Sequence, residues 1–266
     1  MNHRVRSLAT VATGLAVLHA LVPEAAARET WLTLVVLPIG YGHLLGGWLF
    51  AGSRMRLTGL EAAFAGASIL SLLCAYTWAL QVETVRWFVL VPMLLISAWH
   101  IVENDLALAR AYRNGLRLRP LPRGAGHHAI VLAATGILGV LAIATPTGAY
   151  YLQLYFDARP PILLTTIPDL ATAVLMVHAI SWIFFFLDRA SALPALRATR
   201  LRRRLFWLHG LPLGANAMLY ACLPAIHFYI ASATLYLFWS VLHAFQTALV
   251  RRTQPRASAS AALAWL

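Results

Sequence analysis

The chain has 266 residues, of which 61% are hydrophobic and only 11% are charged. A soluble globular domain carries about a quarter charged residues, so this composition excludes an ordinary soluble fold and predicts an all-α, polytopic integral membrane protein. The net charge of +12 comes entirely from arginine. Because the arginines are spread over several segments and form no single patch, the charge does not indicate a nucleic-acid partner.

Eight apolar runs reach the length of about 20 residues that a spanning helix needs. They lie at residues 8–26, 30–51, 58–80, 86–105, 126–149, 162–187, 205–226 and 228–249. We therefore predict about eight transmembrane helices in one domain, residues 1–252, followed by a loosely ordered tail, residues 253–266. We expect this domain to lie in a bacterial-type inner (plasma) membrane as a multi-pass protein.

The arginines predict the orientation of these helices. Eighteen of the 21 lie in the N-terminal segment, in alternate loops or in the C-terminal tail, and the other three, Arg28, Arg86 and Arg159, fall one in each of three intervening loops. The positive-inside rule then places both termini and the basic loops in the cytoplasm. The two richest loops, 110–123 and 197–204, are also expected to attract anionic membrane lipids.

The first apolar run allows two interpretations. Residues 1–7 are charged, the run is short, and the small residues Ala25 to Ala27 resemble a signal-peptide cleavage site. We favour a retained helix. Cleavage would leave seven helices without changing the orientation of any of them.

A weak internal repeat relates the two halves of the chain. Ionisable residues recur in the second and sixth, the fourth and eighth, and the third and seventh runs: His43 and His178, His100 and His243, Glu61 and His209. Four helices is an even number, so this duplication predicts a 4+4 parallel repeat in which both halves have the same orientation.

Five histidines on different predicted helices fall at a similar depth, about 6 to 14 Å from the cytoplasmic ends at 1.5 Å per residue. They are His43, His100, His178, His209 and His243. Imidazole binds iron, zinc and copper, and helical bundles build metal sites from side chains on facing helices. The shared depth therefore predicts a metal site formed by these five residues. For each alone, a hydrogen-bonded interhelical histidine is the alternative.

The stretch from His100 to Asp105 ends an apolar run with several polar groups. On a helix, Glu103 and Asn104 share the face of His100, whereas Asp105 points elsewhere. Charged groups at membrane depth are costly unless they face protein, water or a metal, so Glu103 and Asp105 are candidate catalytic residues. Solvated acids at the membrane boundary are the alternative. In a similar way, Gln246 lies on the face of His243 and is a candidate for orienting its ring.

Four glycines surround His43, namely Gly40, Gly42, Gly46 and Gly47. Close helix packing is one explanation for such small residues. A slot for a flat or extended lipid substrate is the other.

Short motifs resemble those of the bacterial and archaeal membrane β-carotene dioxygenases, the Brp/Blh family. The segment from His100 to Asp105 is similar to the family's His-Phe-Gly-x-x-Asp box, and the segment around His43 to its Pro-His-Gly-x-x-Asp box without the proline and the aspartate. The stretch from Leu235 to His243 resembles its His-Ser-x-Arg-His box, with Thr247 at the second histidine position. The resemblance implies cleavage of a carotenoid to retinal by oxygen and histidine-bound iron.

Together these features predict an iron-dependent (non-haem Fe²⁺) membrane oxygenase or desaturase that acts on a lipophilic substrate from the bilayer. A b-type haem electron carrier with two axial histidines is the main alternative. A proton or solute transporter using histidines and Glu61, or a zinc lipid hydrolase, is the third. The sequence has no His-Glu-x-x-His, Gly-x-Ser-x-Gly or Walker motif, so it gives no support for serine-hydrolase or phosphoryl-transfer chemistry.

Overall fold

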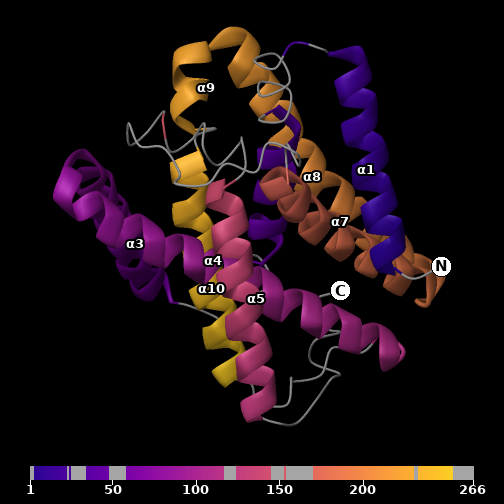
Figure 1. Cartoon of the computed structure of the whole chain (residues 1–266). Helices are drawn as coiled ribbons and strands as arrows, with labels where there is room; N and C mark the ends of the chain where they lie inside the picture. Colours follow the sequence, from indigo (N-terminus) through magenta and orange to yellow (C-terminus); the bar gives the residue numbers. More distant parts are fainter. Residues whose placement is uncertain are drawn as a thin grey trace.

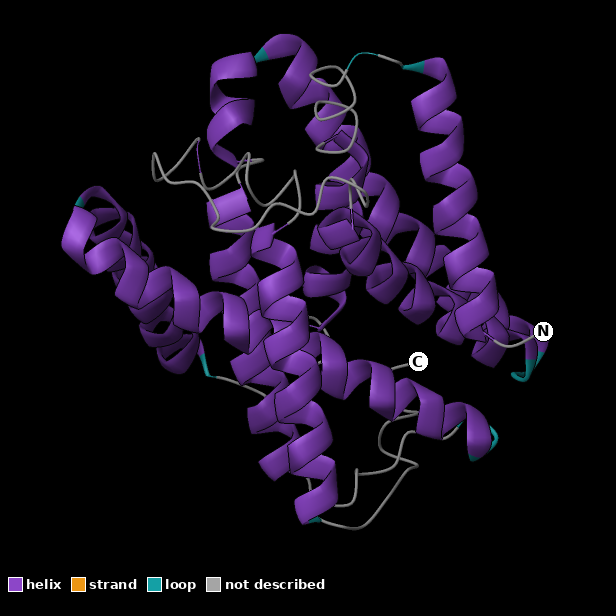
Figure 2. Cartoon of the chain, viewed as in Figure 1, coloured by secondary structure: helices purple, strands orange, loops and turns teal. Residues whose placement is uncertain are grey.

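The computed structural model describes residues 3–22, 24, 34–47, 58–116, 124–144, 153, 170–230 and 233–253, and within them all regular structure is helical (Figure 2). Each predicted apolar run overlaps a helix. The helices are α1 (His3–Leu21), an unlabelled helix (Leu34–Gly47), α3 (Gly59–Gln81), α4 (Glu83–Arg113), α5 (Ala125–Ala144), α7 (Leu170–Ser191), α8 (Ala195–Cys222), α9 (Pro224–Ile230) and α10 (Ala233–Thr253).

Within the described ranges, three segments are long and apolar enough to cross a membrane, namely Gly59–Gln81, Thr84–Arg113 and Ala173–Ser191. On α3, large apolar side chains face outwards, and Leu60, Phe64 and Trp78 are 82%, 75% and 66% exposed. A surface of this kind is unfavourable in water and is normal in lipid. The chain is therefore a helical membrane protein, and the count of eight spans remains a prediction.

Local sequence explains where α3 begins and where α4 ends. At the start of α3, Glu61 N–H donates to the Thr58 hydroxyl, and Thr58 N–H donates to the Glu61 carboxylate at 2.8 Å, which is a capping box. At the end of α4, Gly115 takes a positive φ of 61° and Leu116 N–H returns to the Ala111 carbonyl at 2.8 Å. This left-handed turn satisfies carbonyls that the helix end would leave free.

Helix α4 occupies the centre of the bundle and contacts α3, α5, α7 and α10 (Figure 1). Near its start, Leu90 packs with Tyr76 of α3 and Phe238 of α10. Near its end, Leu108 and Ala111 pack with Phe185 of α7, and all three are fully buried. The two apolar clusters hold α4 on the N-terminal and the C-terminal side of His100.

Two helices extend beyond their predicted ends. Helix α4 continues to Arg113, so the predicted loop 110–123 begins as helix, and α8 begins at Ala195, so the predicted loop 197–204 is helical throughout. Arginine is a good helix former, and Ala198, Leu201 and Leu205 form an apolar stripe that packs against α7. The prediction of loops at these positions was wrong because apolar run length alone does not detect amphipathic extensions.

Other predictions concern residues outside the described ranges. The possible cleavage site at Ala25 to Ala27 and residues 254–266 of the predicted tail are among them. His3 lies in the charged N-terminal segment that precedes the first predicted run, yet it is the first residue of α1 and is buried. Helix α1 packs along α7 (Figure 1).

Candidate metal centre

Four histidines from four helices converge beside the middle of α4. His43 comes from the Leu34–Gly47 helix, His100 from α4, His178 from α7 and His243 from α10. The candidate ligand nitrogens of His43, His100 and His178 all lie within 4.8 Å of one another. Two nitrogens that share an ion at about 2.1 Å each are at most about 4.2 Å apart. The three imidazoles are therefore close to the spacing that one metal ion requires.

His243 completes the group. Its ring centroid lies 4.8 Å from that of His100 and 5.1 Å from that of His43, with the planes nearly perpendicular in both pairs. The ring of His43 is also 5.1 Å from that of His178. We call His43, His100, His178 and His243 the four-histidine cluster.

The cluster is enclosed by protein. His100, His178 and His243 are each about 5% exposed or less, and His43 is half-buried. The Nε2 atoms of His43 and His178 are buried and have no hydrogen-bond partner among the described residues. A buried polar nitrogen without a partner costs about 1–3 kcal/mol. A ligand shared by these nitrogens, such as a metal ion, would remove that cost.

Asp105 orients the ring of His178. The two residues lie on α4 and α7, and His178 Nδ1 is 3.1 Å from a carboxylate oxygen of Asp105. A carboxylate only accepts, so Nδ1 carries the proton and Nε2 keeps its lone pair for a metal. A carboxylate–histidine pair of this kind fixes the tautomer and raises the basicity of the ligand.

Gln246 plays the same part for His243. The Oε1 atom of Gln246 is 3.3 Å from His243 Nδ1, and its Nε2 donates to the Gly47 carbonyl at 3.2 Å. The glutamine amide is thereby held from both ends, and as the acceptor for Nδ1–H it fixes the tautomer in which Nε2 carries the lone pair. Gln246 was predicted to act in this way from its position three residues after His243. Thr247, also on that face, instead donates to the His243 carbonyl.

The Asn104 amide contacts His100. Its nitrogen lies 2.7 Å from His100 Nε2, and the side chain is 2% exposed. This pair matches the shared helical face predicted for the two residues. If the amide nitrogen donates to Nε2, the ring proton lies on Nδ1. If the amide is turned so that its oxygen accepts from Nε2–H, Nδ1 keeps its lone pair for a metal.

The glycines near His43 are sites of close packing. A Cβ atom at Gly47 would overlap the His243 ring, one at Gly42 the His209 ring, and one at Gly40 the Tyr236 phenol. Side chains of α8 and α10 therefore occupy the space beside these three glycines. This favours close packing over a substrate slot.

The remaining candidates are not grouped with the ligand atoms of the cluster. His209 packs against Gly42, is hydrogen-bonded to the Ile39 backbone, and does not join the three grouped ligands. Glu103 is half-buried and likewise lies outside the group of ligand atoms among the described residues. Glu61 belongs to the exposed capping box of α3. Of the two predicted catalytic acids, Asp105 contacts the cluster, where it holds the ring of His178.

The pairing of α4 with α7 was missed by the sequence reasoning. Asp105, Leu108 and Tyr112 lie on one face of α4, and their partners His178, Phe185 and Asp188 lie on one face of α7. Both sets follow helical spacing, three or four residues or their sums. The matching spacing was a signal that could have paired these helices and assigned Asp105 to His178.

Comparisons with protein-family models, with characterised proteins and with solved structures find no match to this chain.

Proposed function

We propose that this chain is a membrane metalloprotein in which His43, His100, His178 and His243 bind one iron ion, and that the iron activates oxygen toward a lipophilic substrate from the bilayer. The convergence of four imidazoles from four helices, three of them buried and His43 half-buried, carries the proposal. Neutral imidazoles suit iron, zinc and copper rather than magnesium or calcium. Iron is preferred because of the motif resemblance to the carotene dioxygenases.

The geometry is less favourable for haem. Two axial histidines of a haem need an open plane for the porphyrin between their rings. In the cluster, neighbouring rings have centroids 4.8 to 6.1 Å apart, with planes inclined at 69° to 84°. The rings thus occupy the space that a porphyrin would need.

Two observations count against a transporter and a zinc hydrolase. Glu61, the acid expected to relay protons in a transporter, caps α3 and is exposed. A hydrolase would need a free carboxylate as a general base near the metal, whereas Asp105 is hydrogen-bonded to His178. Both observations favour oxygen chemistry over these alternatives.

The finer architecture belongs to the same proposal. We infer eight spanning helices, cytoplasmic termini, an inner-membrane location and a 4+4 parallel repeat. The repeat is supported by two of its three predicted pairs, His43 with His178 and His100 with His243, since all four residues meet in the cluster. The third pair, Glu61 with His209, lies outside it.

Metal analysis of the purified protein tests the proposal. We expect about one iron per chain, no Soret band, and a large and similar loss of iron for an alanine variant at each of the four histidines. His19→Ala, on α1, should keep its iron and serves as the control. Full iron content in His100→Ala or His243→Ala, or wild-type protein free of transition metal, would refute the proposed centre.

Expression in a host that accumulates β-carotene tests the substrate. If the chain cleaves carotenoids, aerated cells should lose colour and accumulate retinal, and His178→Ala cells should stay coloured. Unchanged pigment with iron-loaded protein in the membrane would exclude carotene cleavage. Another lipophilic substrate would then be sought with the same centre.

A further inference from the structure

A row of aromatic side chains leads from the four-histidine cluster toward the basic end of α4. The ring of Trp182 lies 5.9 Å from that of His43, Phe185 lies 5.7 Å from Trp182, and Tyr112 lies 5.9 Å from Phe185. These are centroid distances, so the ring edges are close to van der Waals contact. An oxidisable tryptophan and an oxidisable tyrosine are thus connected to a candidate metal ligand.

Helical spacing produces this row. Trp182 and Phe185 follow His178 by four and seven residues, so they lie on the face of α7 that carries the cluster ligand. Tyr112 comes from α4 and reaches the same face beside Leu108 and Ala111, which pack with Phe185. Phe185 is fully buried. The row is therefore held by the α4–α7 core and excludes solvent at its centre.

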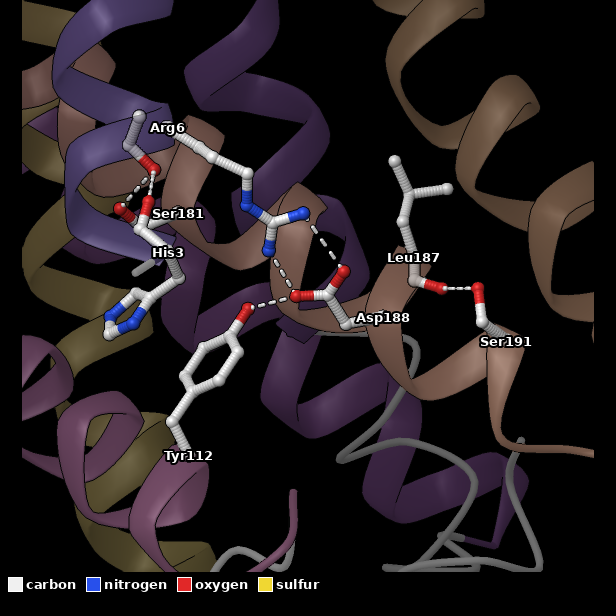
Figure 3. Close-up of polar contacts among 8 residues, drawn as sticks. His3, Arg6, Tyr112, Ser181, Leu187, Asp188 and Ser191 are labelled. Carbon is white, nitrogen blue, oxygen red and sulfur yellow. Dashed lines mark hydrogen bonds and ion pairs between the residues drawn. The ribbon is translucent and has the colours of Figure 1, made fainter. Parts of the chain in front are cut away.

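The far end of the row is a hydrogen-bond network (Figure 3). The Tyr112 hydroxyl donates to a carboxylate oxygen of Asp188 at 2.7 Å, and Arg6 of α1 donates to both oxygens of that carboxylate. The His3 ring stacks on Tyr112 with centroids 3.9 Å apart and planes at 6°. The Asp188 side chain is 27% exposed, so the network is accessible from outside the core.

These surroundings give the row a direction. Oxidation of a tyrosine releases its phenolic proton, and the Asp188 carboxylate is in position to take it. The Nε1 atom of Trp182 is buried and has no acceptor among the described residues. Loss of a proton makes oxidation easier, so Tyr112 is oxidised more readily than Trp182. An oxidised Trp182 will therefore take an electron from Tyr112.

We propose that Trp182 and Tyr112 form an electron-transfer path between the metal centre and the surface, which rests on the proposed function. With iron bound by the cluster and oxidised by oxygen or peroxide, Trp182 would give one electron to the metal, and the resulting tryptophan radical cation would take one electron from Tyr112. The phenolic proton passes to Asp188. A cytoplasmic thiol then gives a hydrogen atom to the tyrosyl radical and becomes a thiyl radical, while Asp188 releases its proton to solvent.

The path would protect the centre. An oxidised metal held by the cluster without substrate would have its own histidine ligands as the nearest oxidisable groups unless an electron reached it from elsewhere. Trp182 is the aromatic neighbour of His43 on this route. An electron drawn through it spares the imidazoles and moves the radical to Tyr112, where a soluble thiol can quench it.

Freeze-quench electron paramagnetic resonance tests the path. Iron-loaded protein mixed with hydrogen peroxide without substrate should give a tyrosyl radical signal. Tyr112→Phe should abolish it, and Trp182→Phe, which keeps a ring but cannot serve as the intermediate, should reduce it to the level of metal-free protein. Tyr76→Phe, on α3 and packed against Phe238, is the matched control and should leave the signal unchanged.

Iron content measured on the same samples separates the two proposals. A wild-type protein that binds iron but gives no tyrosyl radical, or a signal that survives Tyr112→Phe, would overturn the path and leave the metal centre intact. Wild-type protein that contains no iron would refute the metal centre and, with it, the path. Trp182→Phe must retain its iron for the loss of signal to support the path.

Discussion

At the residue scale, the close contact between Gly47 and His243 leaves no room for a methyl group at position 47. A Cβ atom at Gly47 would overlap the His243 imidazole, whereas one at Gly46 would lie 3.7 Å from Leu208, an ordinary contact. The two glycines are neighbours in the same helix, so a substitution at each has the same effect on helix propensity. Any difference between the two variants reports on the room beside the cluster.

Gly47→Ala should therefore lower both stability and iron content. Overpacking costs about 1–3 kcal/mol, and the displaced His243 ring would bind iron less well. Gly46→Ala should be neutral or more stable, since alanine is favoured over glycine in a helix by about 1 kcal/mol. Thermal unfolding and metal analysis of both proteins measure this. Equal behaviour of the two variants would contradict the close contact.

The partners of the ligand rings can be tested in a similar way. Gln246→Leu removes the acceptor for His243 Nδ1 and should weaken iron binding by about 10- to 100-fold, as expected for loss of a group that orients a ligand. Thr247→Val is the control, because the Thr247 hydroxyl donates to the carbonyl of its own helix. Chelator competition measures the affinities. An unchanged affinity in Gln246→Leu would show that Gln246 does not orient the ring.

At the residue scale, contacts could be predicted from the sequence where both partners lie on the same helix. The contacts of Asn104 with His100 and of Gln246 with His243 are three or four residues apart, and sequence spacing identified both. The contact of Asp105 with His178 joins two helices, so spacing from His100 suggested only that Asp105 points elsewhere. Within-helix geometry follows from the sequence, whereas the choice of partner helix depends on packing.

At the scale of elements, α1 is joined to the bundle by polar contacts near its first residue. Arg6 binds the Asp188 carboxylate, and the Ser181 hydroxyl donates to that of Ser7 at 2.9 Å. Sequence reasoning treated residues 1–7 as a charged end because it counts charge and not the partner of each charge. The one acidic residue of α7 among its described side chains, Asp188, provides that partner.

A double-mutant cycle on Arg6→Ala and Asp188→Ala should give a coupling free energy of about 1 kcal/mol, since the pair is bidentate and only partly screened. The exposed fraction of each side chain is 27%. Thermal unfolding of the two single variants and the double variant gives this value. If the losses in the free energy of unfolding are strictly additive, the pair does not hold α1 against α7.

At the scale of the whole molecule, the sequence identified the helices better than their ends. Apolar runs located every long helix, because burial in lipid demands a continuous apolar segment. They missed the extension of α4 to Arg113 and that of α8 back to Ala195. Depths measured from the predicted ends were therefore approximate, and His209, predicted at the same depth as the others, packs against Gly42.

The orientation of the molecule can be tested on α8 alone. Arg200 and Leu223 lie at opposite ends of this helix, separated by about 35 Å at 1.5 Å per residue, which is enough to span a bilayer. Both side chains are exposed, and the two native cysteines, Cys74 and Cys222, are exposed as well. Single cysteines at the two positions therefore require a background without the native pair.

In intact cells, an impermeant thiol reagent should label Leu223→Cys and spare Arg200→Cys, because five arginines between Arg197 and Arg204 favour the cytoplasmic side. Permeabilised cells should give equal labelling, which controls for reactivity. The reverse pattern would invert the proposed topology and place the four-histidine cluster near the outer surface. Labelling of both in intact cells would mean that α8 does not cross the membrane, and the eight-span arrangement would fail with it.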